Sequence, residues 1–549
     1  NDLMNIKGYT RTQAQNLVYS GGLSIYTTQD ARIQSILDEE YADPSNYPDY
    51  VQYALDYALT VKNPQGEEVN YSKEMMKLYF QNEDPSFDLL FDSQDEGQTY
   101  VDRYKANILA DGSTVVAERV SFAPQPQSAM TIIDQHTGYV KAIIGGRGTK
   151  TASLTLNRAT DSTRQPGSTF KIVSTYAAAL NEKGMTLATT YEDQPITYDN
   201  GAPVNNASGS FNGTTTIRTA IRNSVNTVAV QCFEDVTPEL GLKYLDNFGF
   251  TTLAHGTEAD TDANGNVYTD ANLPTALGGL TYGVKNVELC AAYAAIANGG
   301  NYIKPVYYTK ILDHNGNVLI ENNSVGRSVI KETTAYLLTS ALEDVVQNGT
   351  GTACQLDNMT VAGKTGTTDA YNDLWFVGYT PYYTCAVWSG YDGNQKIPEG
   401  DARNFHKTLW RKVMNRIHQG MEYKDFEVPD GIEQISICAD TGLLPRVGCP
   451  VTEEYFDVGT MPTEYCDQHF YEYDESQDED MEIYDVNATP TPDPENPDGT
   501  DNTDGSGGDG TGGDGTGGDG TGGDGTGGGD IQYPDESGGD SGNDDIYYY

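Results

Sequence analysis

The chain has 549 residues and a formal net charge of −47 at pH 7. This length exceeds that of one typical domain, so the chain can bury at least one large core. So acidic a chain lacks the basic face that a phosphate backbone requires, which argues against nucleic acid as a partner.

The N-terminal quarter shows weak patterns. Residues 1–23 look helical, and the stretch GGLSIYTTQD then predicts a short strand that is followed by a helix in ARIQSILDEEYAD. Residues 24–125 mix short periodic runs with long polar insertions such as SQDEGQTYVDRYKANILADGS. We interpret this region as a linker and pedestal without chemistry of its own.

The pattern sharpens from residue 126. Two β-rich runs around the turn from Asp134 to Gly138 predict a hairpin, and helices are expected from Ser168, in TIRTAIRNSVNTVAVQCFEDV, and before a Gly-Gly stop in VKNVELCAAYAAIANGG. Strand patterns return at MTVAGKTGTT, DLWFVGYTP and YYTCAVWSGYD. Strands at both ends with helices between them predict an α+β fold, an antiparallel sheet covered by helices.

The C-terminal part changes composition twice. A short cysteine-bearing module spans residues 426–475, and residues 476–549 are rich in Pro, Gly and Asp, with GGDGT repeated. Such a tail cannot bury enough apolar surface to fold, so we expect it to be disordered. The expected organisation is therefore 1–23, 24–125, 126–425, 426–475 and 476–549.

The stretch RQPGSTFK contains the first candidate site. Ser168 and Lys171 are three residues apart, so on a helix their side chains share one face. A hydroxyl, an amine to take its proton, and the free N–H groups of a helix start are the parts needed for acyl transfer. The pattern S-x-x-K occurs by chance about twice in such a chain, and a helix N-cap explains Ser168 equally well. A second copy, from Ser328 to Lys331, lies in a strand-like run and is interpreted as fortuitous.

Two further motifs favour chemistry over capping. Ser224 and Asn226 form S-x-N in RNSVNTVAV, where a helix start is expected. The S-x-N pattern is common by itself. The run Lys364, Thr365, Gly366, Thr367 lies in a predicted strand, and K-T-G is expected by chance only about 0.1 times in this chain.

The three motifs together resemble the active-site set of serine penicillin-recognising enzymes. With GGLSIYTTQD, NRATDSTRQPGSTFK, AGKTGTT and DLWFVGYTP, the chain resembles the transpeptidase portion of class A high-molecular-weight penicillin-binding proteins over residues 20–470. The resemblance implies a penicillin-binding/β-lactamase-like fold and a peptidoglycan D,D-transpeptidase. The enzyme would act on the outer face of a bacterial cytoplasmic membrane, on stem peptides and β-lactams, without a cofactor.

The resemblance also implies roles for individual residues. Ser168 would be acylated, Lys171 would accept its proton, and Ser224 would pass a proton to the leaving amine. Asn226 would hold the donor peptide, Lys364 would keep the site cationic, and Thr365, Gly366 and Thr367 would bind the donor carboxylate and backbone. The backbone N–H groups of Ser168 and Thr367 would form the oxyanion hole. The motifs leave open whether Lys171 or Lys364 is the acting base.

The chain departs from the family pattern in two respects. Nothing before residue 20 is long enough for a glycosyltransferase domain, so we expect no glycan polymerisation from this chain, and we expect a membrane anchor upstream of Asn1. Val225 occupies the middle of the second motif, where β-lactamases carry Asp.

Two other clusters raise the question of metal. Asp260, Asp262 and Asn264 resemble the first half of a calcium loop without its final Glu, and a polar Asn-Gly turn is the favoured interpretation. The second cluster has the spacing C-x10-C-x16-C-x2-H, formed by Cys438, Cys449, Cys466 and His469. A disulfide, a zinc site and free thiols remain open there, with the disulfide preferred. No metal is assigned to the transpeptidase site.

Two alternative functions remain. Water could replace the acceptor amine, giving a D,D-carboxypeptidase or β-lactamase, or the chain could be a non-catalytic penicillin-recognising sensor or scaffold. The motifs do not identify the acceptor or the oligomeric state.

Overall fold

The computed structural model describes residues 1–323 and 325–469. The predicted disordered tail, residues 476–549, and the last residues of the cysteine module lie outside the described residues. Within the described ranges, every helix is too short or too polar to span a bilayer.

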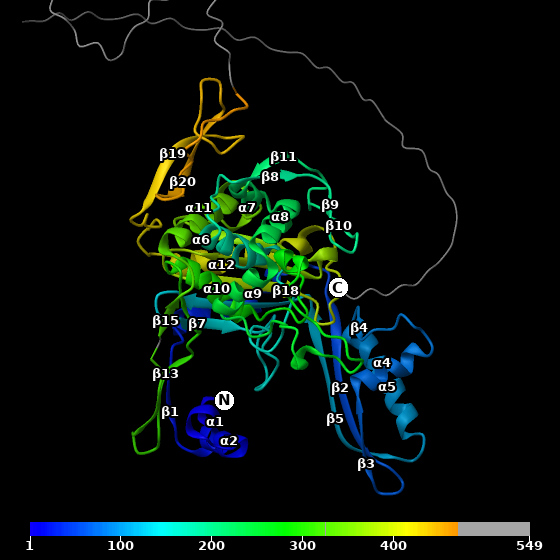
Figure 1. Cartoon of the computed structure of the whole chain (residues 1–549). Coiled ribbons are helices and arrows are strands. Elements are labelled where there is room, and N and C mark those ends of the chain that lie inside the picture. The colour runs from blue at the N-terminus through cyan, green and yellow to red at the C-terminus, as the bar shows by residue number, and fades with distance from the viewer. Residues whose placement is uncertain (324, 470–549) are drawn as a thin grey trace, which may run out of the picture. The chain divides into compact units, whose positions relative to one another are not determined.

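A five-stranded antiparallel sheet lies at the centre of the predicted 126–425 region (Figure 1). Its strand order is β16-β17-β18-β6-β7, and the predicted hairpin is formed by β6 and β7. The strands are β6 (Gln127–Asp134), β7 (Tyr139–Ile144), β16 (Ala362–Thr367), β17 (Asp373–Tyr379) and β18 (Thr384–Gly390). The predicted α+β fold with an antiparallel sheet is therefore confirmed.

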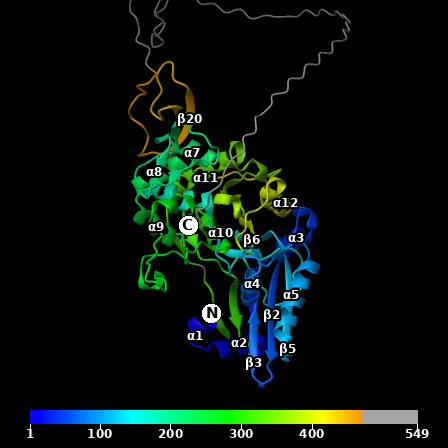
Figure 2. The ribbon, with the colours of Figure 1, turned by 90° about the vertical axis from the view of Figure 1, so that its right-hand side faces the viewer.

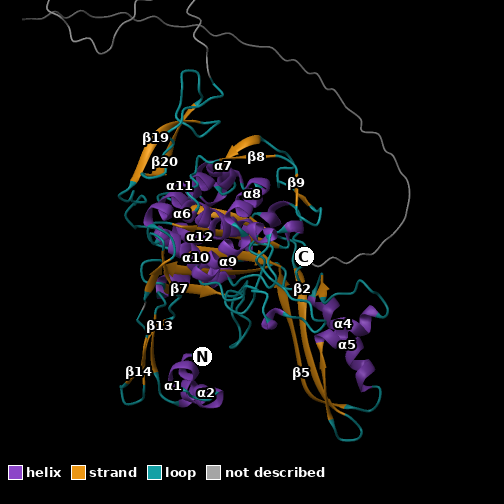
Figure 3. Cartoon of the chain, viewed as in Figure 1, coloured by secondary structure: helices purple, strands orange, loops and turns teal. Residues whose placement is uncertain are grey.

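Helices cover both faces of this sheet (Figure 3). Successive strand residues point to opposite faces. Ala129 and Ile133 therefore pack on one face of the sheet, and Met130 and Ile132 pack on the other. The first face carries α6 (Ala177–Glu182), α7 (Ile217–Asn223), α8 (Asn226–Val236), α9 (Pro238–Asn247), α10 (Asn286–Ala297) and α11 (Glu332–Asn348). The second face carries α3 (Ala31–Ala42) and α12 (Phe405–His418).

Helix α3 belongs by its contacts to the sheet and not to the pedestal, in which the sequence placed it. Asp30 caps its N-terminus by accepting from the backbone N–H groups of Arg32 and Ile33. The apolar stripe of the helix, Ile33, Ile36, Leu37 and Tyr41, packs into the same core as α12. The boundary between the pedestal and the catalytic region therefore does not follow the order of the chain.

The pedestal is a separate small α/β layer. Strands β2 (Gln52–Lys62), β3 (Glu68–Ser72), β4 (Leu90–Phe91) and β5 (Thr114–Gln125) pair around β2, with α4 (Lys73–Gln81) and α5 (Gln94–Leu109) against them (Figure 2). Helix α5 forms where the sequence indicated only a polar insertion. Its hydrophobic stripe of Val101, Tyr104 and Ile108 is buried, so a narrow apolar face is enough to pack this helix on the pedestal sheet.

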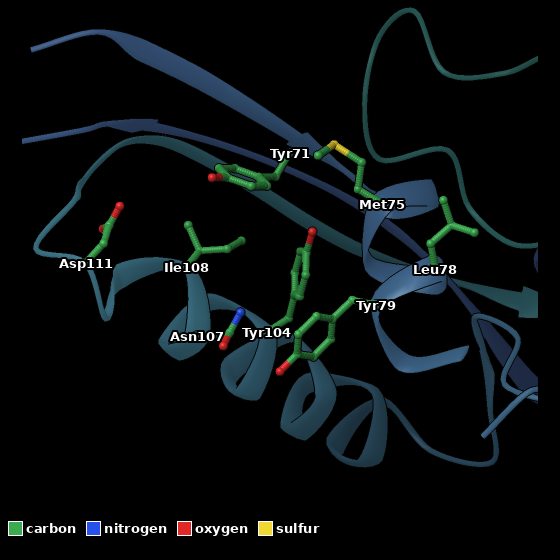
Figure 4. A pocket seen from close by; sticks show the side chains of 8 residues that line it. All are labelled: Tyr71, Met75, Leu78, Tyr79, Tyr104, Asn107, Ile108 and Asp111. Atoms are coloured by element: carbon green, nitrogen blue, oxygen red, sulfur yellow. The ribbon is translucent and has the colours of Figure 1, made fainter. Parts of the chain in front are cut away.

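A cavity of about 510 Å³ opens between β3, α4 and α5 (Figure 4). None of the predicted site residues lines it. Its walls are mostly aromatic and aliphatic, from Tyr71, Met75, Leu78, Tyr79, Tyr104, Asn107, Ile108 and Asp111.

Segments distant in sequence pair beside the N-terminus. Helices α1 (Asp2–Lys7) and α2 (Arg11–Ser20) confirm the predicted helical start, and β1 (Ser24–Thr27) pairs with β13 (Tyr308–Leu312), which pairs with β14 (Val318–Glu321). The remaining strands form short two-stranded ribbons: β8 (Thr190–Asp193) with β11 (Gly213–Thr216), β9 (Ile196–Thr197) with β10 (Pro203–Val204), β12 (Asn301–Ile303) with β15 (Gly326–Ser328), and β19 (Ile432–Cys438) with β20 (Val451–Asp457).

Candidate active site

Ser168 lies in a tight turn rather than in a regular α-helix. The turn Gly167–Thr169 is a 3-10 helix, followed by a wider π turn at Ile172–Tyr176 and then by α6. The helix expected from Ser168 is thus irregular in its first turns, a feature that is frequent at functional sites. Ser168 is partly exposed, whereas Lys171 is fully buried.

Close backbone contact holds this turn against β16. Gly167 has a φ of +54°, and a Cβ atom there would lie 2.8 Å from the carbonyl oxygen of Thr367. A Cβ atom on Gly366 would lie 2.5 Å from the carbonyl oxygen of Pro166, and one on Gly278 would lie 2.5 Å from that of Gly167. A side chain on Gly167 or Gly366 would push the turn away from the strand, and one on Gly278 would collide with the backbone of the turn, so all three positions require glycine.

Strand β16 is an edge strand of the sheet. The N–H of Thr368 donates to the carbonyl oxygen of Asp373 at 3.1 Å. Hydrogen-bonded pairs alternate along an antiparallel ladder, so the backbone groups of Thr365 and Thr367 point away from β17, toward the open edge. An extended peptide can pair with such an edge beside the Ser168 turn.

Four of the predicted site residues meet in one hydrogen-bonded cluster. The Lys171 Nζ donates to the backbone oxygen of Ser224 at 2.7 Å, to the Ser224 Oγ at 3.3 Å and to the Asn226 Oδ1 at 2.6 Å. The Lys364 Nζ donates to the same Ser224 Oγ at 2.9 Å. The Ser224 hydroxyl therefore bridges the two amines. The hydroxyl of Ser168 makes no hydrogen bond with any described residue.

Ser224 reaches both lysines because it lies in a break between two helices. It ends α7 in the left-handed conformation, with φ 58° and ψ 40°, and Asn226 is the first residue of α8. A non-glycine residue in this conformation is strained, and such strain persists where the surrounding structure imposes it. The sequence predicted a helix start at this motif. The structure adds that the same motif also ends the preceding helix.

The two lysines are buried without counter-ions. Both are 0% exposed, and neither has a carboxylate within 4.0 Å among the described residues. Burial, together with the nearby charge of Lys364, holds the pKa of Lys171 well below its usual value. Burial alone lowers the pKa of Lys364 to about 7. The pair is therefore poised to have one neutral and one charged amine near neutral pH.

The other motif residues lie along the same strand. The Thr365 hydroxyl pairs with that of Thr350 at 2.8 Å, and Thr367 is exposed at the end of β16. The second S-x-x-K copy is elsewhere: Ser328 ends the exposed strand β15 and Lys331 precedes α11, and neither bonds to a predicted site residue.

A buried hydrogen-bond network, which no sequence pattern indicated, supports Asn226. Asp193, which is 1% exposed, accepts hydrogen bonds from the Nδ2 of Asn206 and the Oγ1 of Thr227, each at 2.6 Å. The Asn206 Oδ1 in turn accepts from the backbone N–H of Asn226 at 2.8 Å. No motif marks these residues, because the network joins β8 and a loop to the start of α8.

Replacing Asp193 by alanine is expected to lower both stability and acylation. Two buried donors, the Asn206 Nδ2 and the Thr227 Oγ1, would lose this acceptor, which costs about 1–3 kcal/mol for each group left unsatisfied. Urea unfolding would measure the loss, and the rate of penicillin acylation would report the displacement of Asn226. The matched control is Asp199→Ala at an exposed site nearby, for which neither quantity should change. Unchanged acylation in Asp193→Ala would contradict the positioning role.

The calcium-like loop forms a turn. The Asp262 carboxylate accepts from the backbone N–H groups of Asn264 and Asn266, at 2.8 and 2.9 Å, and Asp260 accepts from those of His255 and Thr257. These carboxylates therefore satisfy the backbone of their own loop, which is the arrangement of an Asx turn.

Comparison with known proteins identifies the region that carries this geometry. Residues 128–415 match the family model for the penicillin binding protein transpeptidase domain, and residues 428–471 match that for the C-terminal domain of penicillin-binding protein 1A. The first match contains all eight predicted site residues.

Curated relatives point the same way. Penicillin-binding protein 1A of Clostridium tetani is 33% identical over 362 residues, which are 63% of this chain and 45% of the relative. The protein of the same name from Clostridium perfringens strain ATCC 13124 is 29% identical over 492 residues, 85% of this chain and 50% of the relative. The chain thus spans about half the length of these relatives.

Solved structures show the same fold. Penicillin-binding protein 1A from Haemophilus influenzae superposes with a TM-score of 0.58 at 20% identity, over 84% of this chain and 76% of that one. The PonA1 protein from Mycobacterium tuberculosis, solved in complex with penicillin V, gives a TM-score of 0.55 at 21% identity, over 78% of this chain and 93% of that one. Since the transpeptidase model matches more than half of the residues, the chain belongs to the penicillin-binding protein transpeptidase family.

Proposed function

We propose that this chain is a serine D,D-transpeptidase that cross-links peptidoglycan stem peptides and is acylated by β-lactams. One observation carries the proposal: two buried lysines, with depressed pKa values, share the Ser224 hydroxyl close to the Ser168 turn and the open edge of β16. The membership of the family and the penicillin V complex of a structural relative support it.

Acylation would begin at Ser168. Its Oγ attacks the carbonyl carbon of the penultimate D-alanine of a stem peptide, while neutral Lys171 accepts the hydroxyl proton. The backbone N–H groups of Ser168 and Thr367 stabilise the oxyanion of the tetrahedral intermediate. The peptide C–N bond then breaks, the terminal D-alanine leaves with a proton relayed through Ser224, and an ester to Ser168 remains.

Transfer to the acceptor reverses these steps. An amine of a neighbouring stem attacks the ester carbonyl and loses a proton to the lysine cluster, and the Ser168 oxygen leaves and is reprotonated. A cross-linking amide forms and the free enzyme returns. With a β-lactam, the leaving nitrogen remains tethered to the acyl group, so it blocks the acceptor path and the ester persists.

The donor would bind as an extra strand along β16. The outward backbone groups of Thr365 and Thr367 would pair with it, and the hydroxyls of these residues with charged Lys364 would bind its terminal carboxylate. Asn226 would hold the donor amide from the opposite side.

We limit the proposal to transpeptidation, the activity that the lysine–serine cluster and the matched transpeptidase model support. Glycan polymerisation is not expected of these residues. We further propose that the reaction takes place on the outer face of a bacterial cytoplasmic membrane, with an anchor upstream of Asn1.

Product analysis would test the function. The protein is incubated with a peptide ending in D-Ala-D-Ala, with and without an added amine such as glycine amide. Released D-alanine and the new amide product are quantified by mass spectrometry. Transpeptidation predicts that the amide product rises with amine concentration at the expense of the hydrolysed peptide. Hydrolysed peptide alone would indicate a carboxypeptidase. A penicillin adduct without any turnover would indicate a sensor.

A further inference from the structure

The C-terminal module has almost no core of its own. It consists of the β19–β20 ribbon and the loops around it. Its apolar cluster buries Ile437 and Phe456 against Ala188 of the transpeptidase region, with the partly buried Ile435 and Met461 beside them. Such small units rarely fold on apolar burial alone and usually need disulfides or a metal.

Four potential ligands converge at one end of this ribbon. Cys438 is the last residue of β19, and Cys449 lies two residues before β20. Cys466 and His469 follow β20 in the chain, and the loop before Cys466 is held to the β19–β20 connection, since the N–H of Cys466 donates to the carbonyl of Leu444 at 2.8 Å. The ribbon and one backbone bridge thus bring distant parts of the sequence together.

The distances between the potential ligand atoms fit an ion with tetrahedral coordination. The three sulfurs and one ring nitrogen all lie within 4.8 Å of one another. The His469 Nδ1 is 3.5 Å from the Cys438 Sγ and 3.3 Å from the Cys466 Sγ. A zinc ion with Zn–S about 2.3 Å and Zn–N about 2.0 Å requires tetrahedral edges of roughly 3.5–3.8 Å. The cluster therefore needs little movement to bind one.

Neighbouring groups hydrogen-bond to the potential ligands, as the groups around a metal centre commonly do. The His469 Nε2 lies 3.1 Å from an Asp440 carboxylate oxygen, which fixes the ring with Nδ1 toward the sulfurs. The backbone N–H of Arg446 donates to the Cys449 Sγ at 3.2 Å. Cys438 and Cys466 are fully buried, so the site is shielded from solvent on that side.

We propose that Cys438, Cys449, Cys466 and His469 bind one zinc ion that stabilises the C-terminal module. This inference revises the preference for a disulfide. All seven cysteines are unpaired, and a disulfide would use two sulfurs and explain neither the third sulfur nor the histidine. Four protein ligands fill the tetrahedron and leave no place for substrate, so the site is structural. The three thiols lose their protons when the ion binds.

The full chain, purified with reductant and dialysed, is expected to contain about one zinc per molecule by inductively coupled plasma mass spectrometry. Replacement of zinc by Co²⁺ should give a thiolate charge-transfer band and the intense visible bands of a tetrahedral ion. The variants Cys466→Ser and His469→Asn should lose most of the bound metal. The matched controls, Cys354→Ala and His255→Asn, change the same residue types outside the cluster and should keep it.

Penicillin labelling of Ser168 in each variant would show that the transpeptidase region is still folded, so metal loss can be assigned to the module. Wild-type protein without zinc, or Cys466→Ser with undiminished zinc, would overturn the proposal. A second preparation made without reductant would overturn it too if its mass were lower by two hydrogens and it held no metal, because that result would indicate a disulfide. Iron in place of zinc would overturn the identity of the ion.

Discussion

Replacing Ser168 by alanine is expected to abolish covalent labelling by penicillin and to reduce peptide turnover by a factor on the order of 10⁶. Without the Oγ atom no ester can form, and water at the same position lacks the entropic advantage of a held nucleophile. Intact-mass measurement after incubation with a penicillin would give one adduct on the wild type and none on the variant. The fold should persist, because the Ser168 hydroxyl makes no hydrogen bond with the described residues.

The matched control is Ser328→Ala in the second S-x-x-K copy, which should be labelled as fast as the wild type. Ser328 lies on the exposed strand β15, and its hydroxyl donates to the nearby carbonyl of Ile330 at 3.3 Å. An adduct that survives in Ser168→Ala and disappears in Ser328→Ala would show that Ser328, and not Ser168, is the acylated nucleophile. No adduct on a folded wild type would favour a scaffold over an enzyme.

Replacing Lys171 by methionine is expected to slow acylation by about 10²–10⁴-fold and to change its pH dependence. In the wild type the rate should rise with pH while Lys171 loses its proton, and fall above about pH 7 while Lys364 loses the charge that binds the carboxylate. The apparent pKa values of the two limbs belong to the interacting pair of lysines, and not to either residue alone. In the variant the acid limb should disappear. The alkaline limb should remain, because Lys171 is already neutral when Lys364 titrates.

Stopped-flow acylation with a chromogenic cephalosporin between pH 5 and pH 9 would measure both limbs. Lys183→Met, which changes an exposed lysine, should retain the wild-type rate and profile. If the alkaline limb disappears and the acid limb stays, Lys364 is the base and Lys171 the cation. The same experiment therefore decides which lysine acts as the base.

Much of the catalytic region was predictable because its signals are local. The β6–β7 hairpin follows from two β-rich runs around the turn from Asp134 to Gly138, and α10 ends at glycines with positive φ. Ser168 and Lys171 are near in sequence, and the K-T-G run was correctly placed on a strand. The residues that the resemblance singled out lie on adjacent elements.

Other features were not predictable from local patterns. Helix α5 was missed because only one narrow stripe of an otherwise polar segment is buried. Helix α3 was grouped with the pedestal because its packing partners on α12 lie more than 350 residues further along the chain. The Asp193 network was missed for a similar reason, since its members come from β8, a loop and α8.

For this protein, residue type and short-range spacing predicted the α+β class, and together with the family resemblance they singled out a candidate nucleophile, two candidate catalytic lysines and a candidate carboxylate-binding strand. Spacing could not show that the Ser224 hydroxyl bridges both amines, or that the sulfurs of three cysteines and a ring nitrogen of His469 lie within 4.8 Å of one another. The first arrangement depends on the burial of the lysines and on the left-handed conformation of Ser224, which is unfavourable in isolation. The second depends on the pairing of β19 with β20 and on the backbone hydrogen bond between Cys466 and Leu444. Only the packed tertiary structure compensates for the cost of the Ser224 conformation and for the desolvation of the lysines, so only the structure decides their chemistry.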